Sequence, residues 1–536
     1  MNERQSQSQF LMQATILATA GFLARILGFL YRIPMQNILG DAGTSVYGQA
    51  YSLYMFFFVM SSAGMPAAIS KMVSYRMTIK QPGNALLVLK VALVVTGTLG
   101  FFAMLIMFFG ANALAAFLSS QHVFYSLRVL APTVFIVSIM SVYRGYFQGL
   151  GNSMPTAVSQ LVEQVLNAIF SVILVFILID EGIAMAAAGG TAASGIGAIF
   201  GLFFIIFVYN LGKDRQIRKI RKYRRSEKPE PALKIAKELV LTATPIVAGT
   251  AIFSITNIID ARMVVNILMN TGFSYMESQE LFGQLSGKYV VITTLPVAIA
   301  AAIATALIPS ITKSVTLGKL RDTHVKINMA LRFTMLICAP AAVGIGVMAH
   351  QILLFLFPNH PQGGILLQVG AASVLFLAIN QVATGLLHGM NMLKVPLVAA
   401  VFGAAIKILL NFALISIPNI NIIGAVISTT VCYIFASSIN LTTVYRTTRA
   451  RIDITGIFIK PILAASFMGF VCYVAYHVIY FLFPSNAIAL LFAISVSVIA
   501  YFTAMITLRG LTKREFGYLP MGKRIVVMLD KIGVDL

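Results

Sequence analysis

Long hydrophobic stretches separated by short polar segments run through almost the whole chain of 536 residues. About fourteen of them approach the roughly 20 apolar residues that an α-helix needs to cross a bilayer. We therefore predict an all-α integral membrane protein, with spans near 10–33, 46–71, 85–110, 125–150, 154–179, 184–211, 235–265, 288–313, 327–357, 364–390, 395–417, 421–445, 456–482 and 486–508. No long hydrophilic stretch remains for a soluble domain.

Composition agrees with this pattern, since 59% of the residues are apolar and only 10% are charged. A soluble protein would carry roughly 25% charged residues. The first apolar stretch begins near Phe10 and lacks a small-residue cleavage site, so we expect a retained helix rather than a signal peptide.

The net charge of +22 reflects topology rather than nucleic-acid binding. Basic residues gather in alternate loops, after the second, sixth, eighth, tenth, twelfth and fourteenth spans, while the intervening loops are neutral or acidic. Because positive loops stay in the cytoplasm, both termini and all even-numbered loops are predicted to be cytoplasmic. We expect a multi-pass protein of the bacterial cytoplasmic membrane, which has the membrane itself as a partner and does not bind nucleic acid.

The two halves of the spans resemble each other in sequence, with matching positions about 240 residues apart. The matched pairs are Pro66 and Pro309, Lys71 and Lys313, Pro155 and Pro396, Asn167 and Asn411, and Gly182 and Gly424. Two six-helix lobes related by a parallel repeat would place a site between them. The predicted parts are an N-lobe at 1–211, a basic cytoplasmic linker at 212–234, a C-lobe at 235–445, two added spans at 446–508 and a cytoplasmic tail at 509–536.

Arg25 and Arg32 lie in the first apolar stretch, where charge is costly and usually functional. Seven residues are about two helical turns, so both cations would share a face. Guanidinium groups bind phosphate bidentately, which predicts a site for an anionic group. The alternatives are that Arg32 extends to the membrane interface and that Arg25 pairs with an acid.

Other charges inside or beside spans are candidates for an ion pair or an ion-coupling site. Glu163 and Lys407 occupy equivalent positions in the two halves, so they could pair across the lobes or make separate local contacts. Asp260 and Arg262 could neutralise each other, or Asp260 could help to coordinate a cation. Lys288 and Arg144 are further candidates for substrate contact. The alternative for both is a position at the membrane interface without a role in binding.

The sequence shows no catalytic constellation, and we expect a protein that is not an enzyme. Acids and histidines do not cluster, and Cys338, Cys432 and Cys472 lie singly in apolar stretches, without metal-ligand or disulfide spacing. The small-residue run at 186–197 favours close helix packing over nucleotide binding. No resident cofactor or metal is expected; a coupling ion, sodium or proton, or the membrane potential would have to supply the energy.

The ensemble of spans, repeat and arginine-bearing first helix resembles the multidrug/oligosaccharidyl-lipid/polysaccharide exporter superfamily. Within it the chain looks most like MurJ-type lipid II flippases of Gram-positive bacteria and their sporulation relatives. The residues that carry this resemblance are ArgIleLeuGlyPhe at 25–29, ProSerIleThrLysSer at 309–314 and ThrLeuGlyLysLeu at 316–320.

The resemblance implies a cationic central cavity for a diphosphate and sugar headgroup, with a groove beside the last two spans for the polyprenyl tail. Arg25 matches a cavity arginine of the family, and Arg32 matches a second with a one-residue shift, because Tyr31 occupies the aligned position. The family's arginine in the second span is absent, and Lys288 lies about one turn from the position of the arginine in the eighth.

The leading hypothesis is a flippase that moves the undecaprenyl-diphosphate-linked peptidoglycan precursor, lipid II, outward by alternating access, as a monomer near cell-wall synthesis machinery. Three alternatives are an exporter of another polyprenyl-linked polysaccharide unit, a cation-coupled multidrug exporter and a non-transporting scaffold. A cationic drug would require acids where this chain carries Arg25.

Overall fold

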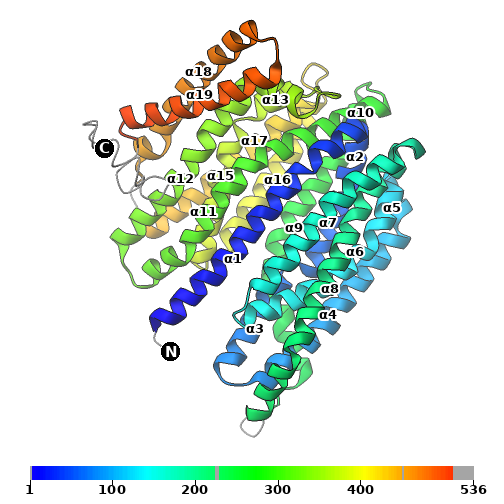
Figure 1. Ribbon diagram of the computed structural model, residues 1–536, viewed down its shortest axis with the longest axis vertical. Coiled ribbons are helices and arrows are strands. Elements are labelled where there is room, and N and C mark those ends of the chain that lie inside the picture. The colour runs from blue at the N-terminus through cyan, green and yellow to red at the C-terminus, as the bar shows by residue number, and fades with distance from the viewer. Residues whose placement is uncertain (1–2, 224–228, 450–451, 511–536) are drawn as a thin grey trace. The chain divides into compact units, whose positions relative to one another are not determined.

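The computed structural model describes residues 3–223, 229–449 and 452–510. Within these ranges the chain forms helices joined by short turns, and no β-strand occurs (Figure 1). The predicted all-α class is confirmed. The predicted C-terminal tail lies outside the described residues apart from its first two positions, as do residues 224–228 of the predicted linker.

The chain divides into two compact units. The first comprises residues 1–295 and 392–436, and the second comprises residues 296–391 and 437–536. Helix α16 and the beginning of α17 therefore belong with the N-terminal helices. The two equal lobes inferred from the sequence repeat stay a prediction.

The first unit contains α1 (Glu3–Leu30), α2 (Arg32–Phe58), η1 (Val59–Ala63), α3 (Met65–Thr78), α4 (Pro82–Phe109), α5 (Ala111–Phe117), α6 (Val123–Gly149), α7 (Met154–Leu178), η2 (Ile179–Glu181), α8 (Ile183–Tyr223), α9 (Ala232–Asn270), α10 (Tyr275–Gly283), η3 (Gln284–Tyr289) and α16 (Lys394–Ile415). The second contains α12 (Leu320–Val347), α13 (Ala349–Leu356), α14 (Gly364–Gly370), α15 (Ser373–Gly389), η4 (Thr455–Ile459), α18 (Lys460–Leu482) and α19 (Asn486–Thr507). Two of the three unit boundaries fall within α11 (Val290–Thr316) and α17 (Ile423–Thr448), and the third lies between α15 and α16.

Twelve described helices are long and apolar enough to cross a membrane, and the bent pair α14 and α15 makes a possible thirteenth. The first predicted span, 10–33, corresponds to α1, whose apolar part, Thr15–Leu30, is shorter than the others. The count of fourteen is therefore not confirmed. The second predicted span begins too late, because α2 already starts at Arg32 and continues through a kink at Gly40.

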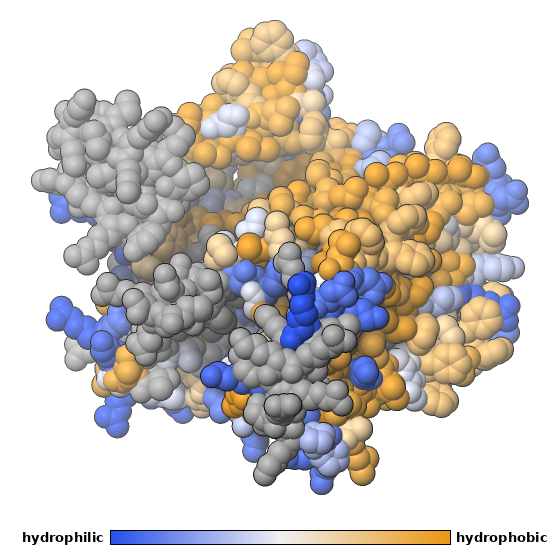
Figure 2. Space-filling model, turned by 60° about the horizontal axis from the view of Figure 1, so that its bottom comes forward, coloured by the Kyte–Doolittle hydropathy of each residue, from blue (hydrophilic) through white to orange (hydrophobic). Residues whose placement is uncertain are grey.

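The surface is as hydrophobic as membrane helices require. Large apolar side chains are exposed on many of them, among them Phe109, Phe203, Phe412 and Phe481. Figure 2 shows hydrophobic side chains over broad continuous areas of the visible face. A contiguous apolar surface of this kind is costly in water, whereas acyl chains solvate it.

Small residues allow α7 and α8 to pack closely along much of their length (Figure 1). Gly197 lies in the small-residue run of α8, and a Cβ at this position would meet the Glu163 carbonyl oxygen of α7 at 2.4 Å. Only glycine permits such an approach between backbones. The run therefore positions α7, which carries Glu163.

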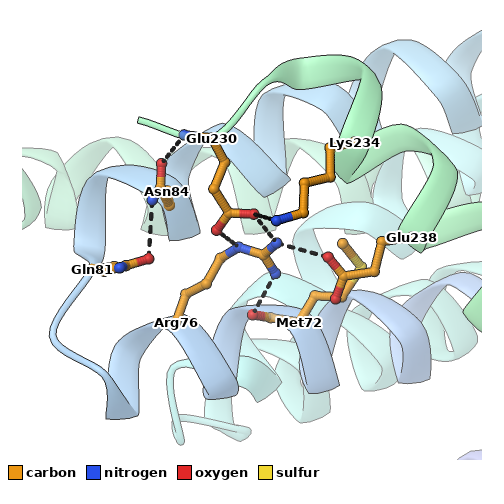
Figure 3. A network of polar contacts seen from close by, with 7 residues as sticks. All are labelled: Met72, Arg76, Gln81, Asn84, Glu230, Lys234 and Glu238. Carbon is orange, nitrogen blue, oxygen red and sulfur yellow. Dashed lines mark hydrogen bonds and ion pairs between the residues drawn. The ribbon is translucent and has the colours of Figure 1, made fainter. Parts of the chain in front are cut away.

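Arg76, at the end of α3, anchors the segment that leads into α9 (Figure 3). Its guanidinium binds both oxygens of Glu230, at 2.9 and 2.8 Å, and donates to Glu238 at 2.8 Å. The Arg76 side chain is only 2% exposed. Asn84 accepts a hydrogen bond from the Glu230 backbone at 3.1 Å, which fixes the same segment from α4. Lys234 lies 4.0 Å from Glu230 but is 69% exposed.

We expect Gly197→Ala to lower the free energy of unfolding by about 1–3 kcal/mol, because the added methyl group overpacks against the backbone of α7. The control is Gly212→Ala on the same helix, where a Cβ meets nothing within 4 Å. Alanine should be neutral or stabilising there by up to about 1 kcal/mol. Thermal unfolding of the purified variants compares the two. Equal melting temperatures would contradict the close approach.

We expect Arg76→Ala to destabilise the protein by about 1–3 kcal/mol, because it leaves two neighbouring carboxylates without their shared cation. Lys234→Ala, which removes an exposed cation from the same network, should cost less than about 1 kcal/mol. Limited proteolysis near residue 230, together with the melting temperature, measures both effects. A larger loss for Lys234→Ala than for Arg76→Ala would show that the network is misassigned.

Candidate functional site

A cavity of about 320 Å³, lined by apolar, polar and charged side chains, lies within the first unit. Its described lining comes from α2, α9, α10, η3, α11, α16 and α17. The charged side chains among these residues are Arg32, Asp260 and Lys407, and tyrosines add hydroxyl groups at positions 47, 51, 289 and 433. Two cations against one carboxylate leave one positive charge in excess, so the cavity favours an anion.

Asp260 and Lys407 form an ion pair between α9 and α16. Both are largely buried, with 16% of the Asp260 side chain and 8% of the Lys407 side chain exposed. Asn411 lies one turn after Lys407 on the same helix face and donates from Nδ2 to Asp260 Oδ1 at 3.0 Å. The carboxylate thus accepts one hydrogen bond at each oxygen.

Arg32 begins α2 and has a different environment, made of tyrosine side chains. The Tyr31 side chain lies beside the guanidinium, and the Tyr31 hydroxyl lies 3.2 Å from that of Tyr47. The Tyr47 ring stacks on Tyr51, with centroids 5.6 Å apart. Arg32 forms no ion pair with any residue that the structure describes. Its charge is therefore available to a ligand in the cavity.

The predicted pairing of Glu163 with Lys407 is wrong. Glu163 of α7 accepts from Arg144 of α6 at 2.8 Å, and Arg144 also donates from Nε to Ser159 at 3.0 Å. Each of the two predicted partners therefore has its own counter-charge, Arg144 for one and Asp260 for the other. Arg144, predicted as a substrate contact, is occupied by this local pair and is not among the described lining residues.

Lys288, another predicted substrate contact, is fully buried and forms an ion pair with Asp41 at 2.7 Å. Gln36 donates to the same carboxylate at 3.2 Å. Asp41 follows Gly40, which takes φ +68° and ψ −178° within α2, a conformation that favours glycine. The kink places Asp41 against η3, so this pair joins two elements rather than facing the cavity.

Arg25 and Arg262 do not contribute to the described lining of the cavity. Arg25 lies exposed on α1. The Arg262 guanidinium lies 4.2 Å from the centroid of the Phe117 ring, an arrangement typical of a cation–π contact. The predicted mutual neutralisation of Asp260 and Arg262 is wrong, because Asp260 pairs with Lys407 instead.

Sequence reasoning missed Asp41 and the cavity tyrosines. The spacing of Tyr47, Tyr51 and Tyr54 at about one helical turn was a readable signal for one aromatic face of α2. Asp41 carried a weaker signal, an acid directly after a glycine in a segment that has no other charged residue between Arg32 and Lys71. No group of three or more histidine, cysteine or acidic side chains suited to a metal occurs in the described part of the chain.

The sequence matches the family described as polysaccharide biosynthesis protein over residues 10–315. It is 30% identical to the lipid II flippase MurJ of Bacillus subtilis strain 168, over 80% of this chain and 81% of that protein. Stage V sporulation protein B of the same organism is 25% identical, over 97% of this chain and 100% of its own length.

Solved structures share the fold. MurJ in an inward closed conformation aligns with a TM-score of 0.67 and 17% identity, covering 92% of this chain and 98% of that one. An inward-facing multidrug resistance transporter of the MATE family aligns with a TM-score of 0.67 and 14% identity, covering 79% and 94%. The chain therefore belongs to the polysaccharide biosynthesis protein family, among the MurJ-like members of the multidrug/oligosaccharidyl-lipid/polysaccharide exporter superfamily.

Proposed function

We propose that this protein is a flippase that moves a polyprenyl-diphosphate-linked saccharide from the cytoplasmic to the outer leaflet of the cytoplasmic membrane. The observation that carries the proposal is the cavity with Arg32, whose charge has no carboxylate partner among the described residues. A diphosphate leaving water loses strong hydration. Charge-assisted hydrogen bonds from a guanidinium compensate for that loss better than neutral groups do.

The remaining lining suits the sugar part of such a headgroup. Tyr47, Tyr51 and Tyr433 offer hydroxyl groups and ring faces, and Ser52 and Asn257 offer further hydrogen-bonding groups. Hydroxyl-rich ligands need many polar partners at fixed positions. The cavity thus combines a cation that could bind an anionic group with hydroxyl groups, amide groups and aromatic rings, as a diphosphate-linked sugar requires.

The chain carries no nucleotide-binding loop in its sequence, so the energy for transport must come from the membrane. The membrane potential is negative on the cytoplasmic side, where the anionic headgroup would start. It therefore favours outward movement of the headgroup. Alternating exposure of the cavity to the two sides completes the proposed cycle.

Lipid II is the proposed cargo, because the relative that matches at 30% identity is a lipid II flippase. Another polyprenyl-linked glycan is the second candidate, favoured by the match to the family described as polysaccharide biosynthesis protein over residues 10–315. Both cargoes place the same diphosphate against Arg32. They differ in the sugar and peptide that the rest of the cavity must accept.

We expect depletion of this protein, in cells without another family member, to reduce the lipid II that an externally added lipid II hydrolase can cleave. Expression of the wild-type protein should restore the amount of cleavable lipid II. Expression of Arg32→Gln should restore about tenfold less of it or even less than that, since a charge-assisted hydrogen bond contributes roughly 1.5–3 kcal/mol. Arg128→Gln is the matched control, because its guanidinium lies over the Phe124 ring at 4.5 Å, outside the cavity lining.

The experiment tests the role of Arg32 and the identity of the cargo separately. Full rescue by Arg32→Gln would overturn the role given to Arg32. Unchanged outer-leaflet lipid II after depletion, with loss of a different glycan polymer, would move the assignment to the second cargo. Equal melting temperatures of the Arg32 and Arg128 variants would exclude misfolding as the cause of any difference.

A further inference from the structure

Asp260 is the only acidic side chain among the described residues that line the cavity. A carboxylate in a membrane interior is costly unless a cation neutralises it. Alkali-metal ions are hard cations that take oxygen ligands, so a buried carboxylate with neighbouring amide and hydroxyl oxygens is where such an ion would bind. The question is whether Asp260 has room for one.

The contacts around Asp260 show that this position is already filled. Lys407 Nζ pairs with Oδ2, and Asn411 Nδ2 donates to Oδ1 at 3.0 Å. Lys407 and Asn411 are 6% and 0% exposed, so both partners are enclosed with the carboxylate. The lysine ammonium supplies the single positive charge that a bound monovalent ion would supply.

We propose that Lys407 is a built-in counter-cation, which occupies the cation position at Asp260 and makes the cavity independent of sodium. A sodium ion would have to displace an ammonium that is tethered to the same protein and therefore present at high effective concentration. Displacement would also leave the ammonium buried without its partner, which disfavours exchange further.

The same geometry predicts a latent sodium site beneath the ammonium. Without Lys407, the carboxylate of Asp260 would be uncompensated. Asn411 Oδ1 is buried and accepts no hydrogen bond from any described group. Thr429 lines the same cavity, and its hydroxyl donates to the Ala425 carbonyl at 2.8 Å, which leaves its oxygen lone pairs as possible ligands. Asn411 presents Nδ2 to Asp260, so its amide would turn over to bring Oδ1 to the ion. The carboxylate, this amide oxygen and a hydroxyl oxygen would then be a suitable ligand set for sodium.

The proposal concerns cation binding and stands apart from the identity of the cargo. Its test uses the purified full-length protein without lipid substrate. Melting temperatures are measured at increasing sodium chloride, with choline chloride holding the ionic strength constant. The variants are Lys407→Ala, the double variant Lys407→Ala/Asp260→Asn, and Lys394→Ala as a control, an exposed lysine at the start of the same helix.

We expect wild type and Lys394→Ala to show no sodium-specific stabilisation. Lys407→Ala should melt lower than wild type in choline, and sodium should raise its melting temperature by roughly 2–4 °C in a saturable manner, because a ligand stabilises the state that binds it. The double variant should lose the sodium response, since its carboxylate is gone.

Two results would overturn the proposal. One is a sodium-specific rise in wild type that Asp260→Asn abolishes, which would place sodium beside Lys407. The other is a folded Lys407→Ala variant without any sodium response. If Lys407→Ala does not fold, the binding of radioactive sodium to wild type and to Asp260→Asn is compared instead. Equal background binding to the two proteins supports the built-in cation. Sodium binding to wild type alone refutes the proposal.

Discussion

The neutralisation of buried charge is the constraint on which the described arrangement of the first unit depends. Three of its ion pairs join different helical elements: Asp41 with Lys288, Arg144 with Glu163, and Asp260 with Lys407. In a low-dielectric interior, removing either member of such a pair leaves a charge that nothing solvates. Each pair therefore specifies which helix faces meet, and the kink at Gly40 serves one of them by bringing Asp41 to η3.

Arg32 gains its distinct role from this pairing of the other charges. Lys288, Arg144 and Lys407 are each neutralised by a carboxylate. The guanidinium of Arg32, which is surrounded by tyrosine side chains, keeps its charge for a ligand. This arrangement argues against the alternative function of a multidrug exporter. A cavity with excess positive charge repels cationic drugs, although the fold is shared with multidrug transporters. Fold and cargo class are thus separate properties, and the side chains of the cavity decide the second.

The helical class and most membrane-crossing segments could be predicted from sequence, because a run of about 20 apolar residues has few other stable structures. Charge pairing could not. Glu163 and Lys407 are equivalent in the repeat, yet equivalence does not bring two positions together in space. Asp260 and Arg262 are two residues apart on one helix, a spacing at which side chains point in different directions. The partner of Lys288 is 247 residues away, beyond the reach of any local pattern.

The balance of charge in the cavity has a consequence for the step in which an empty carrier returns. The unloaded cavity carries one positive charge in excess. A bound diphosphate adds about two negative charges, so the loaded cavity becomes net negative. In the proposed flippase, a membrane potential that is negative inside would then draw the loaded form outward and the empty form inward, at about 2.3 kcal/mol per charge per 100 mV for complete passage. Under the proposed function, one electrical gradient would therefore favour both halves of the cycle, and resetting the carrier would require no second ion.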